Sequence, residues 1–77
     1  MTFSEALEAI RAGRSLRRHG WSAGRRVYLA PPPLIHMGGR VVLPPPILEV
    51  SNPDQPWGSP WHATSPDLLA TDWEEVA

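Results

Sequence analysis

The chain has 77 residues with seven arginines, eight acidic residues and a formal net charge of −1, and it contains neither lysine nor cysteine. A chain of this length forms one domain at most, so we treat residues 1–77 as a single domain without disulfides or cysteine-ligated metals. The near-zero net charge argues against a binder of nucleic-acid polymers, and the apolar runs are far shorter than the ~20 residues of a membrane span. The composition therefore predicts a soluble protein that binds neither nucleic-acid polymers nor membranes.

The charges of the two halves have opposite signs. Residues 1–40 hold seven Arg and two Glu (+5), whereas residues 41–77 hold six acids and no base (−6). One interpretation is an arginine-lined site for a phosphorylated ligand, because the guanidinium fork matches phosphate oxygens. The other interpretation, which we favour for most of these arginines, is that the two halves pair with each other. Since a lone monomer of this size is marginally stable, we also expect a homo-oligomer.

The first predicted element is a helix over residues 3–12. Thr2 and Glu5 form a capping-box pattern at its start, and Gly13 suits a left-handed C-terminal cap. The apolar face has helical spacing and consists of Phe3, Ala6, Leu7 and Ile10. A short strand over 16–19, placed at a sheet edge, follows this helix. A turn through Gly20 then leads to an alternating strand over 26–30.

The middle of the chain contains a local duplication. RVYLAPPP at 26–33 is echoed by RVVLPPP at 40–46, with Met37-Gly38-Gly39 between the copies. This pattern predicts a hairpin of the two repeated strands around the Gly-Gly turn, with both proline triplets outside the ladder. A weaker alternative is that the triplets are polyproline II ligands for a partner protein.

The remaining elements are short. We predict a strand over 47–50, a turn over 51–54, a helix over 66–70 and a closing strand over 72–76. Thr64 or Ser65 caps the short helix, and Asp67 complements its dipole. The predicted fold class is α+β, with a small antiparallel sheet packed against one N-terminal helix and a short C-terminal helical turn.

Catalytic chemistry is poorly represented. Ser65, His62 and Asp67 are the residue types of a nucleophile, a base and an acid, but no strained elbow surrounds the serine. The three histidines of the chain lack metal-ligand spacing. We therefore predict no catalytic residue, no metal and no cofactor.

The tryptophans point to a binding function. Four of them, at positions 21, 57, 61 and 73, are too many for so small a core to enclose. Indoles stack on flat aromatic ligands, and their proximity to arginines suggests a nucleotide. The alternative is that Trp73 and Trp21 are core or subunit contacts.

Three motifs resemble a known family. TFSEAL at 2–7 with Gly13, RRHGW at 17–21 and WHATSPDLLATDWE at 61–74 occur in the order and spacing typical of the phage Thoeris anti-defence proteins of the second type. The resemblance covers residues 2–21 and 61–76, which is about half of the chain. Departures are Thr64, where the family usually has Ser, Ser22, where Asn is common, and the proline-rich middle at about 30–56, where we expect ligand choice to vary.

The resemblance implies a phage protein that acts in the cytoplasm of the infected bacterial host. Members of this family sequester cyclic ADP-ribose-type signals, such as glycocyclic ADP-ribose, without cleaving them, and some capture cyclic oligonucleotides. They form homotetramers with pockets where subunits meet. A proline- and tryptophan-rich inhibitor of a partner protein is the competing hypothesis, and a phosphodiesterase-like enzyme ranks well behind.

Matching the family motifs position by position gives a set of candidate ligand-binding residues. Trp21 or Trp61 is assigned to stack the purine, Arg18 to contact phosphate, and Thr64 or Asp67 to bond ribose or base edges. The purely structural alternatives are that Thr64 and Asp67 only cap the short helix and that Trp73 only fills the core. The full set is Arg18, Trp21, Trp61, Thr64, Asp67, Asp72 and Trp73.

Overall fold

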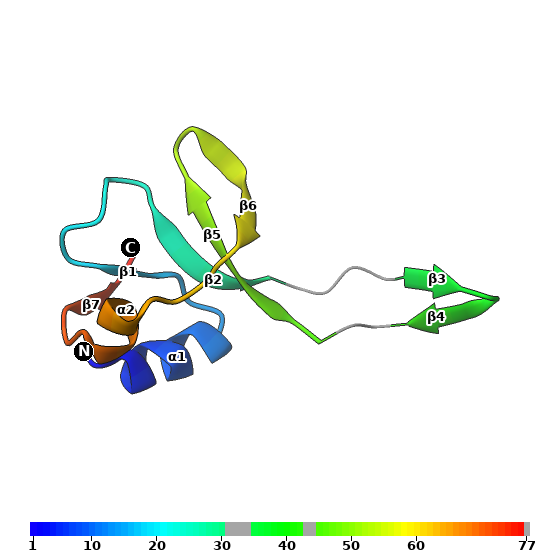
Figure 1. Ribbon diagram of the computed structural model, residues 1–77, viewed down its shortest axis with the longest axis horizontal. Helices are drawn as coiled ribbons and strands as arrows, with labels where there is room; N and C mark the ends of the chain where they lie inside the picture. Colours follow the sequence, from blue (N-terminus) through cyan, green and yellow to red (C-terminus); the bar gives the residue numbers. More distant parts are fainter. Residues whose placement is uncertain (31–34, 43–44, 77) are drawn as a thin grey trace.

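The computed structural model describes residues 1–30, 35–42 and 45–76, and it shows a helix packed against an antiparallel sheet (Figure 1). This arrangement confirms the predicted α+β class. In chain order the elements are α1 (Phe3–Arg11), β1 (Leu16–Arg18), β2 (Arg26–Ala30), β3 (Ile35–Met37), β4 (Arg40–Val42), β5 (Ile47–Asn52), β6 (Gln55–Pro60), α2 (Ser65–Leu69) and β7 (Trp73–Glu75).

The main sheet has five strands in the order β6-β5-β2-β1-β7, and all neighbours are antiparallel. Strand β1 was predicted at an edge, and this was wrong, because β1 lies between β2 and β7. Leu16 on β1 is completely buried, which a central position favours. The edges are β6 and β7 instead.

The first helix is positioned by local hydrogen bonds, as predicted. The backbone N–H of Thr2 donates to Glu5 Oε1 (2.9 Å), and the Glu5 N–H donates to Thr2 Oγ1 (3.3 Å). At the other end Gly13 has φ 93° and donates to the Ile10 carbonyl (3.0 Å). These bonds satisfy backbone groups that a helix leaves without partners at its ends.

The core lies between α1 and one face of the sheet. Its side chains are at most 2% exposed and come from α1, β1, β2 and β7: Ala6, Ile10, Leu16, Val27 and Trp73. Residues from both ends of the chain therefore meet in one small core. The Met1 amine reinforces this meeting, because it donates to the carbonyls of Thr71 (3.1 Å) and Trp73 (2.9 Å).

The two repeated segments do not pair with each other, so that prediction was wrong. Strand β2 pairs with β5, with Val27 opposite Val50, while β4 pairs with β3. Val50 is buried and all three residues of β4 are exposed, so pairing with β5 brings more apolar surface into the core. The Gly38-Gly39 turn itself is confirmed, with φ values of 56° and 79° that suit a tight hairpin.

The β3–β4 hairpin projects away from the main sheet (Figure 1). The prediction for the first proline triplet lies outside the described residues, and so does Pro44 of the second. Pro45 and Pro46 are exposed and precede β5.

Strand β6 was missed by the sequence analysis. Pro56, Gly58 and Pro60 lie within its six residues, and this composition indicates a turn. The strand forms because it lies at an edge and pairs only with β5, so that prolines without an N–H are tolerated on its open side. Strand β5 also extends two residues further than predicted, to Asn52.

The closing elements follow the prediction closely. Helix α2 begins at Ser65, one residue earlier than predicted, and β7 is confined to Trp73–Glu75. Among the described residues, no helix is long and apolar enough to cross a membrane.

Candidate functional site

Four aromatic side chains from distant parts of the chain form one group, which we call the aromatic cluster: Phe3, Trp21, Trp61 and Trp73. The ring centroids of Trp21 and Trp73 are 5.4 Å apart, and those of Trp61 and Trp73 are 5.8 Å apart, both in edge-to-face geometry. Such arrangements are favourable between aromatic quadrupoles. The fold therefore unites three of the four tryptophans.

Exposure divides the cluster into a base and an accessible part. Trp73 is 2% exposed and forms the base, whereas Trp21 and Trp61 are half-buried. The backbone N–H of Trp61 donates to the Leu48 carbonyl (2.9 Å), which holds this residue beside β5. Trp57 lies on β6, outside the cluster, and is 72% exposed. Of the clustered indoles, Trp21 and Trp61 thus offer surface to a ligand.

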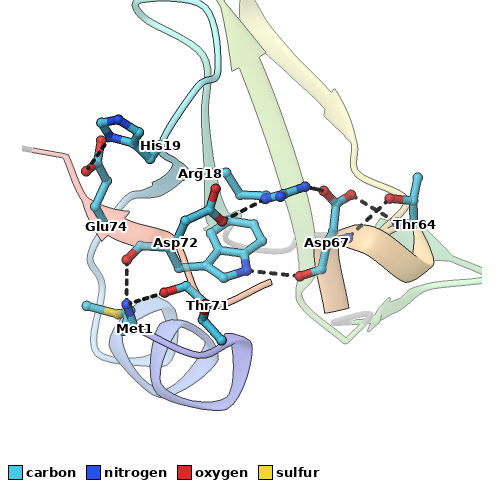
Figure 2. Close-up of polar contacts among 9 residues, drawn as sticks. Met1, Arg18, His19, Thr64, Asp67, Thr71, Asp72 and Glu74 are labelled. Atoms are coloured by element: carbon cyan, nitrogen blue, oxygen red, sulfur yellow. Dashed lines mark hydrogen bonds and ion pairs between the residues drawn. The ribbon is translucent and has the colours of Figure 1, made fainter. Parts of the chain in front are cut away.

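Arg18 is engaged on two sides by carboxylates (Figure 2). Its Nε donates to Asp72 Oδ1 (3.0 Å) and its Nη1 donates to Asp67 Oδ1 (3.2 Å). Because Arg18 lies opposite Trp73 in the β1–β7 register, its side chain is on the face of the sheet that carries the cluster. Arg18 therefore ties α2 to the segment that precedes β7.

Thr64 and Asp67 form a capping box at the start of α2. The Thr64 N–H donates to Asp67 Oδ2 (3.0 Å), and the Asp67 N–H donates to Thr64 Oγ1 (3.3 Å). The Asp67 backbone carbonyl also accepts a buried hydrogen bond from the Trp73 indole (3.0 Å). We call Arg18, Thr64, Asp67 and Asp72 the polar network, which is joined to the aromatic cluster through this last bond.

The polar network favours ionised carboxylates. Burial opposes ionisation of Asp67, but hydrogen bonds from Thr64 and Arg18 outweigh it, so the pKa of Asp67 lies below its ordinary value. The hydrogen bond from Arg18 likewise lowers the pKa of Asp72. Arg18, in turn, has a raised pKa, chiefly because of its hydrogen bond to Asp72. At neutral pH the network therefore carries one positive and two negative charges.

The loop between β1 and β2 presents Trp21 and Arg25. The Trp21 N–H donates to the Arg18 carbonyl (3.1 Å), and the Arg25 N–H donates to the Ser22 carbonyl (3.0 Å). These turns place the Arg25 guanidinium carbon 4.8 Å from the centroid of the Trp21 ring. Gly24 allows this path, since its φ is 86° and a Cβ there would collide with Pro53.

Arg25 was not among the residues singled out from the sequence. Its Nε is buried and has no hydrogen-bond partner among the residues that the structure describes. No carboxylate in that part of the chain lies within 4.0 Å of its guanidinium. The available signal was its spacing of four residues from Trp21 across a glycine-containing turn.

The two oppositely charged halves meet along β1 and β7. Arg14 pairs with Glu75 (3.2 Å) and Arg17 with Glu74 (2.8 Å), and Arg18 belongs to the polar network. Pairing within one protomer thus accounts for three of the seven arginines. We expected it for most of them, but the described residues provide no ion pair for the other four.

Three hollows formed by described residues lie outside the predicted site. One of about 510 Å³ is lined by Leu7, Arg11, Leu29, Pro46 and Leu48. Another of about 330 Å³ is lined by Gly24, Arg26, Ser51, Asn52, Pro53, Pro56 and Val76. A third, of about 370 Å³, is lined by Ser4, Leu7, Glu8 and Arg11. None of the seven predicted site residues lines any of the three. The seven residues form two adjoining groups, one on each side of Trp73. The first group is the polar network, and the second is the pair of accessible indoles.

The described residues contain no group of three His, Asp or Glu side chains able to hold a metal ion. Asp67, which was considered as the acid of a catalytic set with Ser65 and His62, is occupied by Thr64 and Arg18.

Comparison with known families agrees with the three motifs. The profile of the Thoeris anti-defense 2-like (Tad2-like) domain matches residues 1–76. The chain belongs to this family. The match extends over the middle of the chain, which the sequence motifs alone did not cover, and it supports a role against Thoeris defence. A search among curated proteins finds no match.

Proposed function

We propose that this protein binds and sequesters a cyclic ADP-ribose-type signalling nucleotide without cleaving it, in the cytoplasm of an infected bacterial host. The observation that carries the proposal is the pair of half-buried indoles, Trp21 and Trp61, beside arginines in a member of the Thoeris anti-defense 2-like family. By neutralising the signal, the protein would block Thoeris immunity.

The stacking partner of the purine is Trp21 or Trp61. Stacking of a base on an aromatic side chain contributes about 1–3 kcal/mol. Arg18 uses Nε and Nη1 for its two carboxylates, so only its remaining N–H groups could add a secondary contact to a phosphate. Thr64 and Asp67 lie beside this group and would bond ribose or base edges in addition to capping α2.

Sequestration without cleavage requires tight binding. A sponge acts stoichiometrically, so its Kd must lie below the cellular signal concentration, and a nanomolar Kd corresponds to about −12 kcal/mol. Such affinity needs an enclosed ligand. Since the predicted residues line none of the three hollows described above, we propose that a second subunit closes the site and that the protein is a homotetramer.

The direct test is ligand capture. Purified protein is incubated with the product mixture of a TIR-domain defence enzyme, filtered and heat-denatured, and the released molecules are identified by mass spectrometry. Near-stoichiometric recovery of an intact cyclic ADP-ribose isomer is the expected result. Recovery of a linearised or hydrolysed product would contradict the sponge. A folded protein that retains nothing would favour a different cyclic nucleotide or a protein partner.

A pair of tryptophan variants locates the binding surface. Trp21→Leu removes a clustered indole, and Trp57→Leu removes the exposed indole on β6. Because stacking contributes about 1–3 kcal/mol, Trp21→Leu should weaken binding roughly 5- to 150-fold. Trp57→Leu should bind like the wild type. Unchanged binding in Trp21→Leu would leave Trp61 as the stacking indole, and a loss confined to Trp57→Leu, with unfolding midpoints unchanged, would place the ligand at β6.

A further inference from the structure

The charge balance of the polar network makes it a poor principal site for an anion. Arg18 contributes one positive charge, and Asp67 and Asp72 contribute two negative charges. Both carboxylates lie within 3.2 Å of the guanidinium nitrogens and have lowered pKa values. A phosphate that approached Arg18 would therefore also meet two ionised carboxylates, whose repulsion opposes binding.

Arg25 has the opposite surroundings. It lies over the Trp21 ring at 4.8 Å and has no carboxylate within ion-pair distance among the described residues. Its Nε is buried and lacks a hydrogen-bond acceptor there. The donors that a ligand oxygen could reach are therefore those of the two terminal guanidinium nitrogens, and no carboxylate of the described residues competes for them.

The position over Trp21 also holds the guanidinium in place. A guanidinium held over an indole by cation–π attraction needs no carboxylate at that site, so its terminal N–H groups stay available for other hydrogen bonds. Phosphate oxygens match these N–H groups in pairs. The turn between Ser22 and Arg25, together with the contact between Gly24 and Pro53, holds the side chain at this position.

We propose that Arg25 supplies the principal contact to the phosphate groups of the ligand, and that Arg18 acts as a positioning residue for α2 and Asp72. This assignment rests on the proposed nucleotide-binding function. It places the stacking indole and the phosphate contact on one seven-residue loop, residues 19–25, with Trp21 and Arg25 acting together. A ligand with a base and adjoining phosphates fits that pair.

Two neighbouring arginines provide a matched test. Arg25→Gln and Arg26→Gln each remove one positive charge from adjacent positions, but only Arg25 contacts Trp21. Binding is measured by isothermal titration calorimetry with purified glycocyclic ADP-ribose. Losing a hydrogen bond to a charged group predicts a Kd about 10- to 100-fold weaker for Arg25→Gln. Arg26→Gln should stay within about threefold of the wild type, the scale of a screened, exposed charge.

A third variant and an unfolding measurement separate a lost ligand contact from a change in folding. Arg25→Lys keeps the charge but loses the planar fork, and should fall between the wild type and Arg25→Gln. Urea midpoints of both glutamine variants should match, so that a binding difference is not a folding difference. If Arg25→Gln binds as tightly as Arg26→Gln, the assignment of Arg25 is wrong while the sponge function stands. If the wild type itself does not bind, both proposals fail.

Discussion

Two sides of the aromatic cluster use their polar residues differently. On the side of α2 and β7, Arg18, Asp67 and Asp72 bond to one another, and Thr64 completes the cap of α2. On the side of the β1–β2 loop, Arg25 rests on Trp21 and its Nε has no partner among the described residues. On the first side the charged groups are paired with one another, whereas on the second side the arginine has no carboxylate partner among the described residues.

An arginine next to an indole in the sequence is therefore not sufficient to define a phosphate site. Arg18 and Arg25 flank Trp21 in sequence, yet the carboxylates that surround Arg18 come from residues 49 and 54 positions away. The role of each guanidinium follows from what the fold places beside it. We therefore expect substitutions on the first side to change mainly stability and those on the second side to change mainly binding.

The largest stability effect is expected at the residue that both sides share. Trp73→Ala removes a 2%-exposed indole and its hydrogen bond to Asp67, and should lower the free energy of unfolding by about 3–5 kcal/mol. Trp57→Ala, at a 72%-exposed position, should change it by no more than about 0.5 kcal/mol. Urea unfolding followed by circular dichroism measures both. An unfolding free energy for Trp73→Ala close to that of the wild type would show that burial of Trp73 does not stabilise the fold.

Acid should weaken the first side, together with the Arg17–Glu74 pair and the cap of α1 at Glu5. The pKa values of Asp67, Asp72 and Glu74 are lowered in the folded protein, so their stabilisation is complete above about pH 4, the value of free carboxyls. As the pH falls below that value and through the lowered pKa values, this stabilisation is lost. Urea midpoints measured from pH 7 to pH 3 should therefore be level at first and then fall.

Arg18→Gln tests whether Arg18 causes this loss of stability in acid. It removes the main cause of the lowered pKa of Asp72 and one of the causes at Asp67. The variant should be less stable than the wild type at pH 7 and lose less stability on acidification. Arg26→Gln is the charge-matched control and should keep the wild-type pH profile. Parallel profiles for all three proteins would remove Arg18 from the network.

The cap of α2 should have a smaller effect. Thr64→Ala removes the hydroxyl that accepts from the Asp67 N–H, and should cost about 0.5–2 kcal/mol. Thr64→Ser keeps a hydroxyl at the N-cap and should cost much less. If the two variants lost equal stability, the Thr64 methyl group, and not the hydrogen bond, would be the stabilising feature.

The smallest effect is expected far from both sides, in the β3–β4 hairpin. Val41 and Val42 are 58% and 39% exposed, so Val41→Ser and Val42→Ser remove little buried surface within a protomer. Each should change the free energy of unfolding by no more than about 0.5 kcal/mol. A larger loss that depends on protein concentration would show that the hairpin is covered by another subunit.

Several elements were predictable because their determinants are local. The capping boxes at Thr2 and Thr64 and the turn at Gly38-Gly39 each depend on residues within three positions of one another. Strand β6 was missed because its prolines indicate a turn until its place at the sheet edge is known. The pairing of β2 with β5 was also missed, since repeated letters carry no information on which copy becomes buried.

The α+β class, the positions of both helices to within one residue, the separation of charge between the two halves and the family motifs could all be read from the sequence. Only the tertiary structure decided which strands are neighbours, that three of the four tryptophans form one cluster, and that Arg18 is paired with carboxylates while Arg25 is not. The physical reason is the separation along the sequence over which each kind of interaction acts. Hydrogen bonds within a turn act between residues close in sequence, whereas burial and ion pairing depend on contacts that form only when the two ends of the chain pack together.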